Sequence, residues 1–156
     1  MKSKTNGFTL VELLLVVVIF AVVILGMLQL YIYTSTASEM AGNKTLAVTE
    51  AANKIEEIRN HEFSDIVTDY SSGGTPGNTF SLTYLTGKGT IYIDSSNPEL
   101  LQIEVVVCWS DKYSRIIGED ADLDGAFDST PTSEDTMQAN NKLDSPVELV
   151  ANIAER

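Results

Sequence analysis

The segment that decides the fold is Gly7-Phe8-Thr9-Leu10-Val11-Glu12-Leu13, which continues as an apolar run to Leu28. A short hydrophilic head, in which Lys2 and Lys4 carry positive charge, precedes it. Glu12 is the one carboxylate inside the run. Because a carboxylate at bilayer depth costs on the order of 3 kcal/mol even on lenient insertion scales, its presence indicates a function.

The apolar run is long enough for a membrane-spanning helix, which needs about 20 residues. Apolar character continues to Tyr33, with Gln29 as the one interruption after Leu28. The lysines before the run predict that residues 1–7 lie in the cytoplasm and that the chain after Tyr33 lies outside. A cleaved secretory signal peptide is the alternative, but its apolar region should span only about 7–15 residues. That alternative also gives the Gly7-Phe8 junction no role.

A second helical stretch follows at residues 34–60 without a turn signal, since this stretch contains no Pro and a single Gly. Its apolar side chains recur every three or four residues and form one stripe: Ala37, Ala41, Val48, Ala51, Ile55 and Ile58. Glu50 and Lys54 have the spacing of an ion pair on the exposed side. We therefore predict one helix from Phe8 to about Asn60, with residues 8–33 in the membrane and residues 34–60 packed on a domain.

Residues 61–156 are predicted to form a small antiparallel β domain, which makes the fold α+β. Alternating apolar residues predict strands at residues 80–84 and 91–93, joined by a turn at Gly87-Lys88-Gly89, and a longer strand at residues 101–109. Residues 115–117 predict a short continuation. The segment 145–156 fits either a final strand or a helix with Pro146 at its first position, and we favour the strand.

An acidic loop at residues 118–146 carries a candidate metal site, with seven carboxylates and no Lys or Arg between Glu119 and Asp135. Alternate aspartates around a Gly turn supply the oxygen ligands that calcium prefers. The candidate calcium ligands are Asp120, Asp122 and Asp124, with closure from Asp128, Glu134 or Asp135. Pro131 stands where an EF-hand needs its Glu, so the loop is not an EF-hand. The alternative is a solvated loop without a metal.

Composition excludes several classes of function. The net charge of −12 argues against a nucleic acid partner, which needs clustered Lys and Arg. The chain has one His, His61, and one Cys, Cys108, so it cannot form an intramolecular disulfide or a site built on several His. Cys108 has the pattern of a small apolar strand residue. No enzyme is expected, because these residues assemble no nucleophile–base or zinc constellation.

The N-terminal pattern resembles the type IV pilin-like signature, in which a basic leader ends in Gly and Phe-Thr-Leu-Val-Glu-Leu follows. The resemblance implies that a prepilin peptidase cuts between Gly7 and Phe8 and that Phe8 is then N-methylated. It implies that Glu12 pairs with the N-terminal amine of a neighbouring pilin subunit. It also implies an inner-membrane location with the C-terminal domain outside the cytoplasm, an assembly platform there as a partner, and a filament at the cell surface.

The second half of the chain is similar to minor pilins of the pilus-modification type, at Cys108-Trp109, residues 115–120 and residues 143–147. Major adhesive pilins usually carry a Pro in the membrane span and a Cys pair near the C-terminus. The span of this chain has no Pro, and the chain has no such Cys pair. A type II secretion pseudopilin, many of which bind calcium near the C-terminus, is one alternative. A membrane-anchored calcium-binding module outside any filament is another, but it leaves Glu12 without a role.

Overall fold

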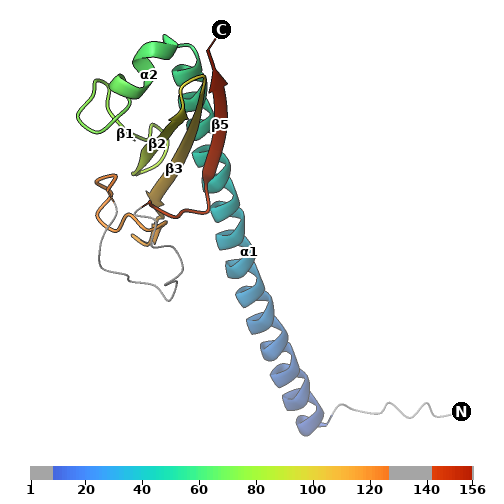
Figure 1. The fold of residues 1–156 in the computed structure, drawn as a ribbon. Helices are drawn as coiled ribbons and strands as arrows, with labels where there is room; N and C mark the ends of the chain where they lie inside the picture. Colours follow the sequence, from blue (N-terminus) through green and yellow to red (C-terminus); the bar gives the residue numbers. More distant parts are fainter. Residues whose placement is uncertain (1–8, 127–141, 156) are drawn as a thin grey trace, which may run out of the picture. The chain divides into compact units, whose positions relative to one another are not determined.

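The computed structural model describes residues 9–126 and 142–155 (Figure 1). The chain divides into two compact units, residues 1–40 and residues 41–156. The helix α1, Leu10–Arg59, begins in the first unit and ends in the second. The predicted helix is confirmed with these bounds, and Phe8 lies outside the described residues.

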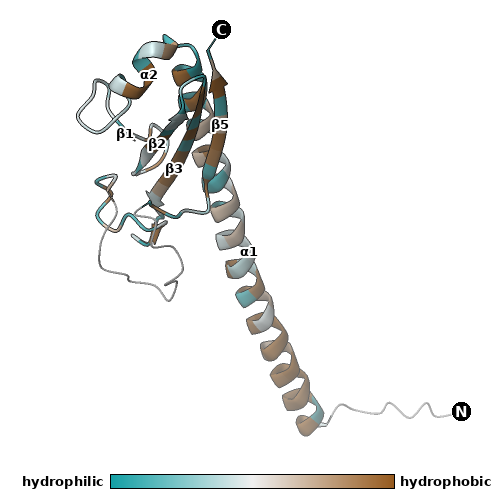
Figure 2. Ribbon diagram, viewed as in Figure 1, coloured by the Kyte–Doolittle hydropathy of each residue, from teal (hydrophilic) through white to brown (hydrophobic). Residues whose placement is uncertain are grey.

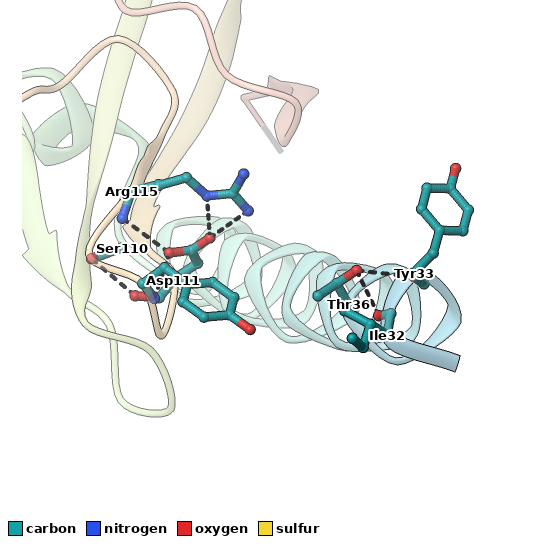
Figure 3. Close-up of polar contacts among 7 residues, drawn as sticks. Ile32, Tyr33, Thr36, Ser110, Asp111 and Arg115 are labelled. Atoms are coloured by element: carbon teal, nitrogen blue, oxygen red, sulfur yellow. Dashed lines mark hydrogen bonds and ion pairs between the residues drawn. The ribbon is translucent and has the colours of Figure 1, made fainter. Parts of the chain in front are cut away.

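The part of α1 from Leu10 to Tyr33 is largely apolar and exposed. Every described residue from Leu10 to Tyr33 is exposed, and the brown colour of this part in Figure 2 shows how continuous its apolar character is. By length and composition α1 is able to cross a membrane, and its most apolar stretch contributes nothing to a protein core. Within the helix, the Thr36 hydroxyl donates to the carbonyls of Ile32 and Tyr33, so its polar group is satisfied locally (Figure 3).

The second unit contains the helix α2, Phe63–Asp69, and a five-stranded antiparallel sheet. The strands are β1, Thr79–Ser81; β2, Gly87–Asn97; β3, Leu100–Ser110; β4, Ile116–Ile117; and β5, Glu148–Ala154. β3 is central: β2 pairs along one edge, and β5 and β4 pair along the other. The predicted long strand, its short continuation and the favoured final strand are confirmed, whereas α2 was not predicted.

The core lies between the last turns of α1 and one face of the sheet. The helix contributes Ala47, Ala51, Ile55 and Ile58, and β3 contributes Leu101, Ile103, Val105, Val107 and Trp109. The prediction for the stripe was right for Ala51, Ile55 and Ile58 but wrong for Ala37, Ala41 and Val48, which are exposed. Ala37 and Ala41 precede Ala47, the first buried residue of α1, and the burial of Ala47 and Glu50 in place of Val48 shows that the buried side is rotated from the predicted one.

The other face of β3 carries a smaller core of Val106, Cys108 and Leu143, with Tyr92 and Leu123 packed against it. Cys108 is a buried free cysteine, as its strand pattern predicts. Burial raises the pKa of its thiol above the ordinary value. Cys108 therefore acts as a small apolar residue that holds the acidic loop against the sheet.

Two predicted turn glycines belong to β2. An added Cβ would lie 2.2 Å from the Cys108 carbonyl oxygen at Gly87 and 2.1 Å from the Phe80 ring at Gly89. These glycines therefore permit close packing, and the prediction of a turn here was wrong. The chain instead turns at residues 82–86, between β1 and β2.

The connection from β3 to β4 is held by Asp111 (Figure 3). Its carboxylate accepts hydrogen bonds from the backbone N–H groups of Tyr113 and Arg115 at 2.8 and 2.9 Å. The Arg115 side chain adds a hydrogen bond at 2.8 Å and an ion pair at 2.7 Å. These contacts fix the turn that leads into the acidic loop.

Candidate functional site

The first candidate site is the start of α1. The Thr9 hydroxyl oxygen accepts a hydrogen bond from the Glu12 backbone N–H at 3.3 Å, and the Thr9 carbonyl accepts one from Leu13 N–H at 3.1 Å. Thr9 is therefore the N-cap, and Glu12 lies in the first turn, where a negative charge favours the helix dipole. Thr9-Leu10-Val11-Glu12 is also a capping-box sequence, a signal that our sequence reasoning missed.

Glu12 is surrounded in sequence by exposed apolar residues. Leu10 and Val11 are 77% and 73% exposed, and Leu13 is 57% exposed. A carboxylate in such a setting needs either water or an opposite charge once lipid or other helices cover the segment. Gly7 and Phe8, the predicted cleavage and methylation positions, lie outside the described residues.

The second candidate site is the acidic loop that follows β4, where Asp120, Asp122 and Asp124 come together. One carboxylate oxygen from each lies within 4.8 Å of the others. Ligands on opposite sides of a calcium ion are separated by about 4.6–5.2 Å, twice a bond of 2.3–2.6 Å. The three oxygens therefore fit part of a calcium coordination sphere, which takes six to eight. Asp128, Glu134 and Asp135, the other predicted ligands, lie outside the described residues.

The loop's own backbone orients these carboxylates. The two oxygens of Asp120 accept hydrogen bonds from Gly125 N–H at 2.9 Å and Asp124 N–H at 3.1 Å. Asp122 also accepts from Asp124 N–H, and Asp124 accepts from Ala126 N–H at 2.7 Å. These bonds leave further lone pairs on each carboxylate, so they do not prevent coordination.

Asp120 is fully buried, whereas Asp122 and Asp124 are exposed. Burial raises the pKa of the Asp120 carboxyl above its ordinary value, although the N–H groups of Gly125 and Asp124 oppose the shift. The charges of Asp124 and Asp122 add to the rise. A cation between these groups would reverse that repulsion, because it favours the charged carboxylates.

The first part of the loop is held at two points, one on the sheet and one on the segment that leads into β5. The Thr90 hydroxyl on β2 donates to the Gly125 carbonyl at 2.9 Å. Glu119 N–H donates to the Asp144 carbonyl, and Asp144 N–H donates to the Glu119 carboxylate, each at 3.0 Å. The aspartate group therefore sits on a fixed base rather than on a free loop.

Glu50 has a structural role that the sequence did not reveal. Its carboxylate is only 7% exposed, and it accepts hydrogen bonds from Thr83 and Tyr84. The predicted exposed pair with Lys54 was wrong, since Lys54 pairs with Glu57 at 2.7 Å. His61, two residues after the end of α1, contacts Asp69 of α2 at 2.7 Å and contributes to no metal group among the described residues.

The model of the prokaryotic N-terminal methylation motif matches residues 2–28. The chain carries the N-terminal motif of type IV pilin-like proteins. Its α+β fold, a long apolar helix packed on a small antiparallel sheet, is the pilin-like one, and this family is structural rather than enzymatic. No curated protein and no solved structure matches the chain significantly. Processing by a prepilin peptidase and assembly with other pilins follow in general from the motif, as does a membrane or pilus location.

Proposed function

We propose that this pilin-like chain is a minor pilin, a structural subunit of a type IV pilus-like filament that is processed after Gly7 and assembled through its N-terminal helix. The observation that carries the proposal is a coincidence of three features. The methylation motif covers residues 2–28, α1 begins within it at Leu10, and the single carboxylate of its apolar part, Glu12, lies in the first turn.

The exposed apolar half of α1 needs a covering. An apolar surface of this size is rare on a monomeric soluble protein and marks contact with a membrane or with other chains. Lipid provides that covering in the inner membrane before assembly, with the C-terminal domain outside the cytoplasm. Neighbouring pilin helices provide it in the filament, after the inner-membrane assembly platform has moved the subunit out of the bilayer.

Glu12 is proposed to pair with the N-terminal amine of a neighbouring processed subunit, in which Phe8 is N-methylated. Opposite charges attract strongly in surroundings of low dielectric constant, and each is costly there alone. Leader removal creates the amine at the apolar end of the chain, so only processed neighbours offer this partner. The pairing therefore couples processing to assembly.

The resemblance at Cys108-Trp109, residues 115–120 and residues 143–147 supports the minor pilin class over the type II secretion pseudopilin class. Fractionation tests the assignment: the full chain is produced with a prepilin peptidase and either a pilus or a type II secretion assembly system. We expect it in sheared filaments of the pilus system. Recovery of the chain in filaments of the secretion system alone would assign it to the pseudopilins. Retention of the chain in the membrane fraction with both systems would contradict a filament role.

The Asp120–Asp122–Asp124 group favours a second candidate function, a membrane-anchored calcium-binding module that does not enter a filament. In that case the chain stays in the membrane fraction, and its domain is stabilised by calcium. A filament subunit that binds calcium would show the same stabilisation and would differ from such a module only in its location. The same fractionation therefore separates the two functions.

A further inference from the structure

We propose that the outer edge of β5 binds an extended segment of another protein, which adds to the sheet as an antiparallel strand and places a Lys or Arg beside Glu148. The site lies within the second unit, residues 41–156. The inference goes beyond the proposed function, because it holds whether or not the chain enters a filament.

The hydrogen bonds that flank β5 show which of its backbone groups face outward. Val107 N–H donates to the Val147 carbonyl at 3.0 Å, and Glu155 N–H donates to the Glu99 carbonyl at 3.3 Å. Residues that face the partner alternate along an antiparallel pair, so the odd-numbered residues of β5 face β3 (Figure 1). The N–H and C=O groups of the even-numbered residues point away from β3 and have no hydrogen bond to another described residue: Glu148, Val150, Asn152 and Ala154.

This edge is open and lacks the usual protection. Edge strands are commonly short, bulged or guarded by Lys or Pro, since an open edge pairs with other chains. β5 keeps an unbroken register with β3 over its seven residues and contains neither Lys nor Pro. Its outward residues have exposed side chains, and Val150 is 53% exposed. A cavity of about 580 Å³, lined by residues 59–64 and 152–155, leaves space beside the end of the strand.

The charges beside the edge indicate the chemistry of the partner. On the sheet face away from α1, Glu148 lies diagonally opposite Glu104 of β3, and its side chain hydrogen-bonds that of Glu104. Lys142 forms an ion pair with Glu104. Partial loss of hydration raises the pKa of Glu148, the bond to Glu104 and the charge of Asp144 raise it further, and Lys142 opposes the rise. Three carboxyl groups thus share one lysine here, and a second cation would be favoured.

A second copy of this chain fits the edge less well than a basic segment. β5 contains one Glu and no Lys or Arg, so a second β5 strand offers no cation to Glu148, and each copy carries a net charge of −12. An added antiparallel strand of another protein would exchange two hydrogen bonds each with Val150 and Asn152. In such complexes the main-chain bonds provide affinity, and the side chains provide specificity.

The probe that tests the proposal is the capped peptide Thr-Val-Thr-Val-Thr-Val-Lys, whose Lys lies opposite Glu148 when its Thr residues lie opposite the other outward residues. Binding to the full chain in detergent micelles is followed by the NMR shifts of the Val150 and Asn152 amides. We expect the same peptide with Glu in place of Lys to bind about fivefold more weakly, the scale of an exposed charge pair. The chain variant Glu148→Lys should reverse this preference, and it should keep the fold because Glu148 is exposed.

Backbone methylation of the peptide separates strand addition from attraction by charge alone. Methyl groups on the nitrogens of the second and third Thr, which face β5, should weaken binding about tenfold. Methyl groups on the nitrogens of the second and third Val, which face away, should leave it unchanged. Equal binding of the two methylated peptides, equal binding of the Lys and Glu peptides, or no shift of the β5 amides would overturn the proposal. So would a concentration-dependent shift of these amides without peptide, because a second copy would then occupy the edge.

Discussion

Glu50 of α1 accepts a hydrogen bond from the backbone N–H of Thr83 at 2.7 Å, across 33 positions of sequence. Its second oxygen accepts the N–H of Tyr84 at 2.8 Å. The turn at residues 82–86 has no strand partner for these two donors, so a buried helix carboxylate satisfies them. This contact fixes the position of α1 against the sheet end where β2 begins.

We expect Glu50→Ala to lower the free energy of unfolding of the domain from residue 34 onward by about 3 kcal/mol, because two donors lose a charged acceptor. Glu50→Gln keeps one acceptor and should lose about half as much. Glu56→Ala is the matched control: its ion pair with Arg59 is exposed and contributes less than about 1 kcal/mol. Equal losses in Glu50→Ala and Glu56→Ala, measured by denaturant unfolding, would contradict the role of Glu50.

Glu12 has two possible contributions, to the charge pair and to the capping box, and two substitutions separate them. Glu12→Gln keeps a capping side chain but removes the charge, whereas Glu12→Ala removes both. We expect both variants to insert into the membrane and both to enter sheared filaments poorly, as measured by quantitative immunoblotting. A normal yield of Glu12→Gln in filaments would refute the charge pair and leave only the cap.

Calcium should stabilise the domain through Asp120, Asp122 and Asp124. Extracellular sites bind near 10⁻⁴–10⁻³ M, so the melting temperature is compared in millimolar calcium and in EDTA. Binding to the folded state alone adds about 2.7 kcal/mol at a hundredfold excess over Kd. Asp122→Ala and Asp124→Ala should abolish the difference in melting temperature between calcium and EDTA. An equal rise with magnesium would instead indicate general screening of the loop's charge.

The Cys108 thiol reports on the packing of the loop. Burial raises the pKa of this thiol in the folded chain. The stability that the protonated thiol contributes is therefore complete at neutral pH and is lost as the pH rises through the folded-state pKa. Alkylation by iodoacetamide at pH 8 should therefore be slow in the folded chain and fast in urea. Gly118→Ala should speed it, since the added Cβ lies 2.4 Å from the Cys108 sulfur and φ is +111°. Rapid labelling of the unchanged chain would show that the loop is not packed as described.

Much of the fold could be predicted from sequence because its patterns are local. The apolar run predicts α1, and strict alternation predicts the central strand β3. The final strand β5 was favoured, although a Pro near its start allowed a helix. The aspartate group follows from alternation around Gly125, whose φ of +88° places it in the left-handed region.

The remaining features depend on contacts between distant residues. Gly89 resembled a turn residue, but the Phe80 ring occupies the space of its side chain. Val48 fits the helical stripe, but it is exposed, and the neighbouring Ala47 is buried instead. Glu50 resembled a surface residue because nothing in the local sequence indicates the two unpaired N–H groups of a turn 33 residues later.

The most direct test of the central claim is the N-terminus of the chain recovered from sheared filaments, measured by intact and tandem mass spectrometry. We predict that the chain begins at Phe8, with one methyl group on its amine and residues 1–7 absent. A filament-borne chain that still carries Gly7 joined to Phe8, or one cut after the apolar run near Ala37 or Ala41, would contradict it.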